Sequence, residues 1–290
     1  MLKYIEIFIS GLTQGAVYCL FALGLSLVYG VARVLNFAHG SFYMAGAYMA
    51  WILSIGYFDL GYPAMFAILV PTLFLSGVLF ERVVVRPLRW GANWKMTTMM
   101  VTLGFAFLLD NVNLIAFGPQ DKTLPAFVTG TVAVGGLVFS YQEIAILTIA
   151  VAIVILLEVV LHGTMFGRAM RAVAQDMQGA RMVGIRIDRI FGYTFGLSVV
   201  LAGVAGVLLA PIYLISPLGG WPPFLKAFVI VVFGGLGSTR GVLLAAFVLG
   251  VIEAFVIYFF GATWTMPAWL LTLLVVLMVR PQGLLGVWSK

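Results

Sequence analysis

Residues 143–162, EIAILTIAVAIVILLEVVLH, decide the fold class of this chain. The stretch is almost entirely apolar, and its length matches the roughly 20 residues that an α-helix needs to cross a hydrocarbon core of about 30 Å. A helix satisfies its own backbone hydrogen bonds in lipid, and a continuous apolar run does not alternate as a barrel strand does. The stretch therefore predicts a membrane-spanning helix.

Similar apolar stretches recur on both sides of it, so we expect an all-α, polytopic membrane protein with about eight spans, plus or minus one. The uncertainty comes from 41–56 and 224–238, which are short and flanked by Gly, Asn or Ser, as broken or half helices are. Residues 1–290 are expected to form a single transmembrane domain. The candidate spans are 5–32, 41–56, 62–80, 96–117, 143–162, 190–215, 224–238, 241–261 and 265–280.

Composition excludes a soluble globular domain. The chain is 63% hydrophobic and 9% charged, against about 25% charged residues in soluble domains, and its mean hydropathy is +1.14. The net charge of +6 does not indicate nucleic acid binding, because no basic patch lies on a soluble domain. Cys19 is the single cysteine, so no intrachain disulfide is possible.

Two basic stretches indicate the orientation, because Lys and Arg are retained on the cytoplasmic side. Two spans separate them, so both are expected on that side, together with the C-terminus. Lys3 and Arg33 flank one span and leave the side of the N-terminus open. Residues 118–142 are expected to form an external cap loop with a hairpin turning at Gly135 and Gly136. The basic stretches hold nine of the sixteen positive charges: Arg82, Arg86, Arg89 and Lys95, then Arg168, Arg171, Arg181, Arg186 and Arg189.

The second basic stretch lies in an expected cytoplasmic loop, 163–190, whose segment GRAMRAVAQDMQGARMVGI (167–185) predicts one amphipathic helix that Gly184 can end. Its apolar stripe consists of Met170, Val173, Met177 and Ala180, and its polar face of Arg168, Arg171, Gln175 and Gln178. Two interpretations remain. Either the helix couples to a partner protein through Met and Arg contacts, or it rests on the lipid surface.

A second interrupted segment is YGVARVLNFAHGSFYMAGAY, 29–48, where two apolar runs are separated by Gly30, Arg33, Asn36, His39 and Gly40. It predicts either a helix broken within the membrane, which lines or hinges a transport pathway, or an ordinary cytoplasmic turn. His39 is not expected to bind a metal, because no Cys, His or acidic cluster accompanies it in the sequence.

Asp110, Asn111 and Asn113 are costly polar residues within an apolar run. They are expected to face an aqueous path or another subunit, or else to form a buried interhelical hydrogen-bond network. Close helix packing is expected at Gly11, Gly15, Gly203 and Gly206.

GGLGSTRG, 234–241, lacks the lysine of a phosphate loop, so no ATP site is expected in this chain. Catalytic motifs and carboxylate pairs at useful spacing are also missing from the sequence, so we expect no catalytic residue, no metal site and no enzyme activity.

Three segments, in order, resemble the LivH-type permeases of branched-chain amino acid ABC importers. They are GLTQGAVYCLFALGLSLVYGVARVLNFAHGSFYMAGAY (11–48), GRAMRAVAQDMQGARMVGI (167–185) and AFVIVVFGGLGSTRGVLLAAFVLGVIEA (227–254). The resemblance covers nearly the whole chain, and NFAHG, GRA-x-RA and FGGLGS together are specific.

The resemblance implies an ABC importer permease fold in a bacterial inner membrane. It also implies a second permease subunit (LivM-like or a second copy), two cytoplasmic P-loop ATPases that bind ATP and Mg, and a periplasmic solute-binding protein, with no cofactor in this chain itself. Leucine, isoleucine and valine are the default solutes, and urea, short amides and aromatic acids are alternatives within the family.

Specific residues follow from the resemblance. ATPase coupling is expected at Arg168, Arg171, Gln175, Asp176, Met177 and Gly184. A pathway or hinge is expected at Arg33, Asn36, His39, Gly40, Asp110, Asn111, Gly234 and Gly235. Asp110 departs from the family, whose members tend to carry an uncharged polar residue there. The alternative function is a stand-alone channel or an ion-coupled secondary transporter.

Overall fold

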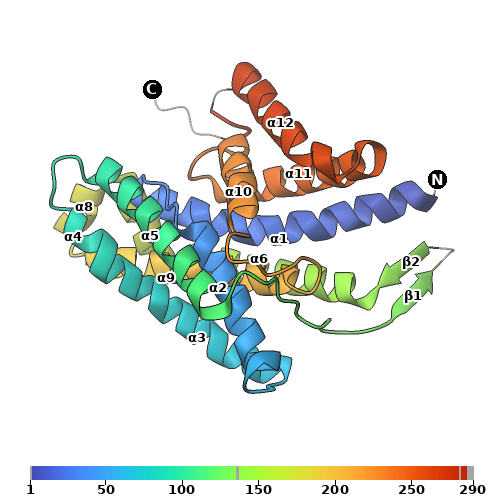
Figure 1. Cartoon of the computed structure of the whole chain (residues 1–290). Coiled ribbons are helices and arrows are strands. Elements are labelled where there is room, and N and C mark those ends of the chain that lie inside the picture. The colour runs from blue at the N-terminus through green and yellow to red at the C-terminus, as the bar shows by residue number, and fades with distance from the viewer. Residues whose placement is uncertain (1, 135–136, 281, 286–290) are drawn as a thin grey trace. The chain divides into compact units, whose positions relative to one another are not determined.

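The computed structural model describes residues 2–134, 137–280 and 282–285, and these are mainly helical (Figure 1). The long helices are α1 (Leu2–Ala32), α3 (Tyr62–Phe80), α5 (Trp94–Phe117), α6 (Tyr141–Gly163), α9 (Ile187–Leu209) and α11 (Thr239–Phe260). The shorter ones are α2 (His39–Trp51), α4 (Arg86–Leu88), α7 (Met165–Gln175), α8 (Met177–Met182), α10 (Trp221–Gly234) and α12 (Thr265–Val279). The π-helical turns η1 (Ile52–Gly56) and η2 (Glu81–Val85) continue α2 and α3, and a 3-10 turn, η3 (Ala262–Trp264), precedes α12.

Seven helical segments in the described part of the chain are long and apolar enough to cross a membrane. The prediction of a polytopic all-α fold with eight spans, plus or minus one, is confirmed. The difference between seven and eight or nine spans depends on whether two short helices are counted. One of these is α10, whose 14 residues cover only about 21 Å of a core roughly 30 Å thick. The other is α2, which η1 lengthens to Gly56.

The predicted hairpin is present as strands β1 (Thr131–Val134) and β2 (Leu137–Ser140), which pair antiparallel with Val132 opposite Phe139. Its predicted turn residues, Gly135 and Gly136, lie outside the described residues. The Val138 N–H donates to Glu6 Oε1 at 3.2 Å. The hairpin therefore lies beside the first turns of α1.

The chain groups into two compact units, each assembled from segments that are distant in sequence. The first unit consists of Met1–Ser26, Pro125–Val154 and Leu225–Lys290. The second consists of Leu27–Leu124 and Ile155–Phe224. Because neither unit is a continuous stretch of chain, composition along the sequence shows no boundary between them.

In the first unit, α1 and α11 touch through their backbones. A Cβ added to Gly11 would lie 2.8 Å from the Cα of Val251, and one added to Gly15 would lie 2.9 Å from the carbonyl oxygen of Ala246. The residue numbers of the contacts increase along α1 while they decrease along α11, so the two helices run antiparallel. Small residues allow such close approach in lipid, where dispersion contacts drive helix association.

In the second unit, α9 packs against both α2 and α3. A Cβ on Gly46 of α2 would lie 2.6 Å from the carbonyl oxygen of Gly203, and one on Gly77 of α3 would lie 2.7 Å from that of Phe195. Gly206 lies against the backbone of Tyr43. Two helices, α2 and α3, are therefore held at backbone contact with α9.

Contacts at the two ends of α1 indicate the side of the N-terminus. Glu6 binds the hairpin that precedes α6, while Arg33, just after α1, donates to the carbonyl oxygen of Ala174 in the loop that follows α6 at 3.2 Å. A spanning α6 places these two connections on opposite sides. With the basic loop on the cytoplasmic side, α1 begins outside. Because α11 runs antiparallel to α1, it ends on the outer side. The next span, α12, then crosses back to the cytoplasmic side, in agreement with the side that the charge pattern predicts for the C-terminus.

Replacing Gly46 by Val tests the backbone contact, because its side chain meets the carbonyl oxygen of Gly203 and forces α2 and α9 apart. We expect a loss of about 1–3 kcal/mol, measured as a lower melting temperature in fluorescence-detected size-exclusion chromatography. Gly40→Val should behave similarly, since its Cβ would lie 2.6 Å from the carbonyl oxygen of Gly220. Gly104→Val in α5 is the control, because nothing lies within 4 Å of a Cβ there. Equal melting temperatures for all three variants would contradict the assigned contacts.

Cysteine labelling tests the orientation, since Cys19 is buried and can be replaced by Ala to give a cysteine-free background. Tyr4 and Met182 are 49% and 88% exposed. Tyr4→Cys is expected to react with a membrane-impermeant maleimide from outside, and Met182→Cys only after permeabilisation. Labelling from the same side, or the reverse pattern, would rule out this topology.

Candidate functional site

The loop predicted over 163–190 contains two helices, so the prediction of one continuous amphipathic helix is wrong. The break lies at Asp176, whose backbone is extended at φ −148° and ψ 107°. Its side chain accepts from the Gln178 N–H at 2.9 Å and so caps α8, as Thr164 caps α7 through the Gly167 N–H at 3.1 Å. An N-cap carboxylate competes with helix continuation, which is why the chain breaks at this residue.

The two faces of this loop separate as the sequence pattern indicates, but the apolar face is already covered. Met170, Val173 and Ala180 are buried, and α7 and α8 both pack on α9 of the same chain. The apolar stripe is therefore not available to a partner protein. Five exposed residues of α7 and α8 form a surface that we call the loop surface. They are Arg168, Arg171, Gln175, Gln178 and Met182.

The remaining predicted coupling residues have structural positions of their own. Met177 is half-buried at the start of α8. Gly184 has φ +84° and follows α8, where the Ile185 N–H donates to the carbonyl oxygen of Ala180 at 3.0 Å. A left-handed glycine of this kind ends the helix, as expected from the sequence.

Beside the loop, two arginines of the first basic stretch surround a buried carboxylate. Glu81, in η2, is fully buried and accepts from Arg86 at 2.9 Å and from Arg89 at 2.8 Å. Arg89 also pairs with Asp188 of α9 at 2.8 Å, and its guanidinium lies 4.4 Å from the centre of the Phe191 ring. This network ties the end of α3 to the start of α9, and a paired arrangement is what allows Glu81 to be buried as a charge.

A groove of about 140 Å³ lies next to this network, on the side of the loop. It lies between α4 and the start of α5 on one side and α8 and the start of α9 on the other, so residues distant in sequence line one surface. The lining residues are Arg86, Arg89, Trp90, Trp94, Met177, Arg181, Ile187 and Asp188. Met177 is thus the predicted coupling residue that lies inside this groove.

For Arg33, the structure favours a turn at the membrane surface over a break within the membrane. Its backbone is left-handed at φ +55°, its side chain is exposed, and it donates to Ala174 of α7. A left-handed residue ends α1, as the last turn of a helix often requires. Arg33 is therefore separated from the buried residues that follow it.

Asn36, His39 and Gly40 are all buried in the second unit. Asn36 Oδ1 accepts from the Ala38 N–H at 3.2 Å, which forms the turn before α2. His39 Nδ1 lies 3.3 Å from the hydroxyl of Ser198. Gly40 touches the backbone at Gly220. These three residues position the start of α2, and none of them lines a described pocket.

Asp110 belongs to a buried hydrogen-bond network. It is 3% exposed, and its two oxygens accept from Ser41 Oγ at 2.7 Å and from Trp221 Nε1 at 3.0 Å. Asn111 is exposed and donates to Phe107 of its own helix at 2.7 Å. The predicted grouping of Asp110 with Asn111 is therefore wrong, because adjacent residues on a helix point about 100° apart. The partner Trp221 is too distant in sequence to be recognised from spacing.

Gly234 and Gly235 form the tight turn between α10 and α11. Gly235 has φ +104°, and a Cβ on Gly234 would lie 2.5 Å from the carbonyl carbon of Gly241. The Leu284 N–H donates to the carbonyl oxygen of Phe233 at 2.7 Å. The C-terminal segment therefore lies against this turn.

A second buried ion pair, which the sequence did not predict, lies in the first unit. Lys226 of α10 and Glu253 of α11 lie 2.5 Å apart, and Lys226 also donates to the Tyr18 hydroxyl of α1 at 2.8 Å. The Lys226 ammonium lies 4.8 Å from the Tyr18 ring centre and 5.6 Å from that of Trp269 in α12. A lone Lys and a lone Glu within apolar helices were available as signals, since each is expensive in lipid unless paired.

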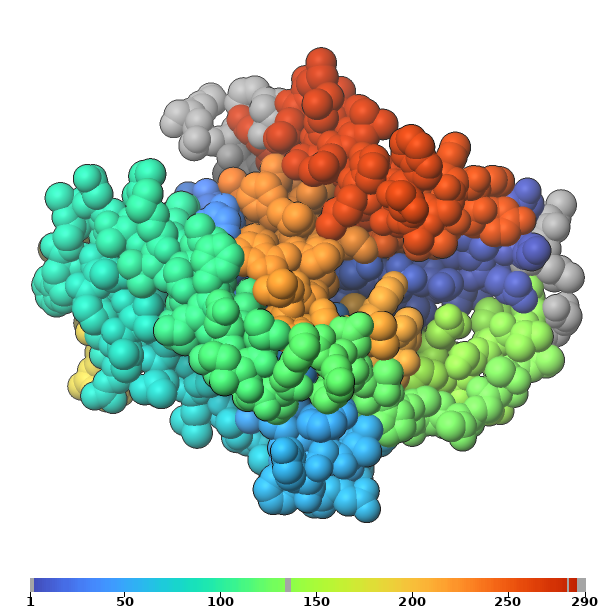
Figure 2. Space-filling view, in the orientation of Figure 1, coloured from blue at the N-terminus to red at the C-terminus, as the bar shows by residue number. Residues whose placement is uncertain are grey.

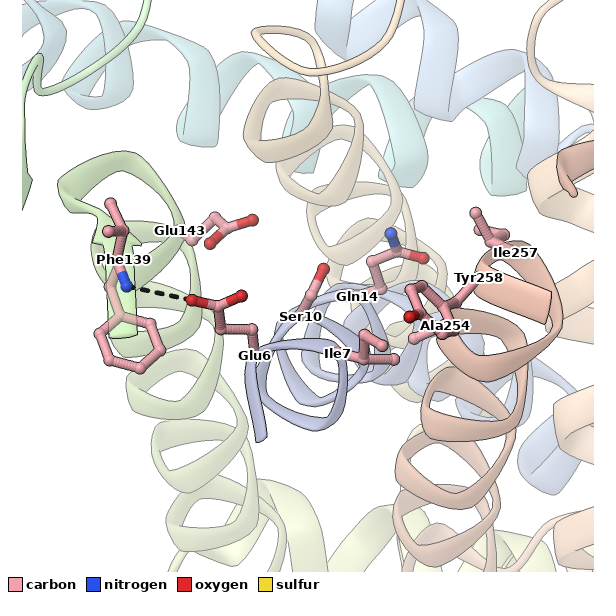
Figure 3. Close-up of a pocket in the computed structure, with 10 residues that line it drawn as sticks. Glu6, Ile7, Ser10, Gln14, Phe139, Glu143, Ala254, Ile257 and Tyr258 are labelled. Atoms are coloured by element: carbon pink, nitrogen blue, oxygen red, sulfur yellow. Dashed lines mark hydrogen bonds between the residues drawn. The ribbon is translucent and has the colours of Figure 1, made fainter. Parts of the chain in front are cut away.

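A pocket of about 360 Å³ opens in the same unit between α1, the hairpin, α6 and α11. In Figure 3 the carboxylates of Glu6 and Glu143 lie on the pocket wall, followed along α1 by Ser10 and Gln14. Within the described residues, no group of three or more His, Cys, Asp or Glu side chains could hold a metal ion.

The chain matches the family described as "Branched-chain amino acid transport system / permease component" over residues 7–280. It is 34% identical to the high-affinity branched-chain amino acid transport system permease protein BraD of Pseudomonas aeruginosa, over 98% of this chain and 96% of that protein. It is 30% identical to the permease protein LivH of Salmonella typhimurium, over 98% and 96%.

A solved structure of PsaBC from Streptococcus pneumoniae in complex with Fab has a TM-score of 0.47 and 13% identity, covering 97% of this chain and 91% of that one. That likeness is too weak to inform the function. The family match and the two relatives each extend over nearly every span described above. The chain therefore belongs to the family of permease components of branched-chain amino acid transport systems.

Proposed function

We propose that this permease imports branched-chain amino acids, namely leucine, isoleucine and valine, across a bacterial inner membrane. The observation that carries the proposal is the 34% identity to BraD over 98% of this chain, because the name of that relative specifies branched-chain amino acid transport. The family consists of transport permeases and not of enzymes. Family membership also favours this function over a stand-alone channel or an ion-coupled transporter.

The proposed assembly contains a second permease subunit, two cytoplasmic P-loop ATPases and a periplasmic solute-binding protein. ATP and Mg would be bound by the ATPases, since 234–241 of this chain lacks a phosphate loop. The loop surface supports docking of an ATPase, because its arginine and glutamine side chains are exposed on the basic side of the protein. Exposed guanidinium groups form strong hydrogen bonds with carboxylates on a partner.

The contacts of the second unit suggest how ATPase closure would reach the membrane. A force on the loop surface passes to α9, because Met170, Val173 and Ala180 pack the loop helices onto it. From α9 it passes to α3 through Asp188, Arg89 and Glu81. Since α2 is in backbone contact with α9, these three helices would move together. Packed helices of this kind shift as rigid elements between discrete arrangements.

Charge reversal at Arg168 tests the coupling role of the loop surface. Arg168 is exposed, whereas Arg171 donates to the Leu161 carbonyl oxygen, so changing Arg171 would also disturb packing within this chain. Arg168→Glu is expected to lower ATP-dependent uptake of radiolabelled leucine roughly tenfold or more, because a charge-assisted hydrogen bond is lost and repulsion added. Uptake and ATP hydrolysis are measured in proteoliposomes with the binding protein present.

Lys95→Glu is the matched control, since it reverses an exposed charge of the other basic stretch outside the loop. Normal uptake by Arg168→Glu, with membrane insertion equal to the wild type, would remove the coupling assignment. Uptake by the wild type that needs an ion gradient and no ATPase would instead contradict the proposed function.

A further inference from the structure

The buried pair of Lys226 and Glu253 lies beside the middle of the long apolar helix α1. Its partner Tyr18 is close to the midpoint of α1, which runs from Leu2 to Ala32. Glu253 is 2% exposed, whereas the Lys226 side chain retains 13%. A charge pair near the middle of a membrane helix bundle is expensive and marks a functional position more often than a structural one.

Two polar atoms of this cluster remain without a hydrogen-bond partner in the part of the chain that the structure describes. One is Glu253 Oε2, an acceptor, and the other is Trp269 Nε1, a donor. Both residues are only 2% exposed, so water does not replace the missing partners at the surface. A buried polar group without a hydrogen-bond partner is destabilising, so a ligand that supplies the partner is favoured. The cluster thus offers one negative acceptor and one donor beside an ammonium group.

A polar stripe on α1 leads toward this cluster from the outer pocket. Glu6, Ser10 and Gln14 line the pocket, and Tyr18 follows at the same spacing of four residues. Residues four apart are neighbours on successive turns, so the stripe follows α1 over about 18 Å from Glu6 to Tyr18 and turns about 40° around the helix at each step. Gln14 Oε1, one turn before Tyr18, is also buried without a partner in the described chain. Figure 3 shows Glu6, Ser10 and Gln14 following one another along α1.

We infer that Lys226, Glu253 and Trp269 form a site for the charged ends of a zwitterionic α-amino acid, reached along the Glu6–Tyr18 stripe. This inference rests on the proposed function and adds the solute site to it. The solute ammonium would bind Glu253, using the free Oε2, while its carboxylate would accept from Lys226 and the Trp269 indole. Each charge stays paired as the solute enters, so desolvation is compensated.

The competing role for the pair is purely structural, as a clamp between α1, α10 and α11. The two roles differ in what happens when both charges are removed together. A buried ion pair replaced by apolar residues of similar volume leaves stability unchanged or improved. The double variant Lys226→Met/Glu253→Leu therefore assembles under either role, and it loses solute recognition only if the pair binds solute.

The test uses the complete importer in nanodiscs, without the binding protein, and measures equilibrium binding of radiolabelled L-leucine. Leucinamide, which lacks the carboxylate, and 4-methylpentanoate, which lacks the ammonium, serve as competitors. We expect both to bind roughly tenfold or more weakly than leucine, and the double variant to lose leucine binding by a similar factor. Its uptake, measured in proteoliposomes with the binding protein present, is expected to fall equally. Glu158→Leu is the control, because it removes a half-exposed carboxylate from another membrane helix, α6.

Trp269→Phe provides a second test that keeps both charges and an aromatic ring, so it does not depend on assembly of the double variant. It is expected to weaken leucine binding several-fold, because the solute carboxylate loses one hydrogen-bond donor. Wild-type leucine binding by Trp269→Phe, or wild-type uptake by an assembled double variant, would overturn the site. A wild-type importer that accumulates no amino acid from a mixture of all twenty would contradict the proposed function itself.

Discussion

Backbone contact between helices is the constraint on which this structure depends. In lipid, apolar side chains gain little by leaving the solvent, so helices associate through dispersion contacts and closely fitted surfaces. Gly46 against Gly203 and Gly77 against Phe195 bring α2 and α3 to α9, and Gly11 and Gly15 bring α1 to α11. Each compact unit is organised around such contacts. The functional residues are presented by helices whose separation these glycines determine.

Close packing leaves little space for unpaired charge, and three buried carboxylates show which side chains bind such a group in this chain. Glu81 is bound by two arginines, Asp110 by a serine and a tryptophan, and Glu253 by a lysine. Glu81 and Asp110 have every oxygen engaged. Glu253 differs, because one oxygen has no described partner. That difference separates carboxylates that stabilise helix positions from one that is suited to bind a solute.

The loop and the buried pair lie in different units, and each unit has its own role in the proposed transport cycle. In the second unit, covering the apolar stripe of α7 and α8 with α9 makes the loop a rigid extension of the helix bundle. A mobile amphipathic helix on the lipid surface would transmit force poorly. In the first unit, the polar face of α1 provides a route of hydrogen-bonding groups through an otherwise apolar helix. Selectivity and coupling would thus depend on separate sets of contacts.

The sequence alone determined the membrane location, the helical fold class and the approximate positions of the spans, because lipid imposes length and apolarity on each span separately. It also predicted the packing glycines and the polar faces of the loop, since these follow from local spacing. Only the tertiary structure decided that Asp176 divides the loop helix, that Asp110 faces Trp221 while Asn111 points away, and that Lys226 meets Glu253. Those outcomes depend on which helices become neighbours. Single-chain spacing cannot reveal that, because each partner lies on a different helix and is selected by shape and charge across the interface.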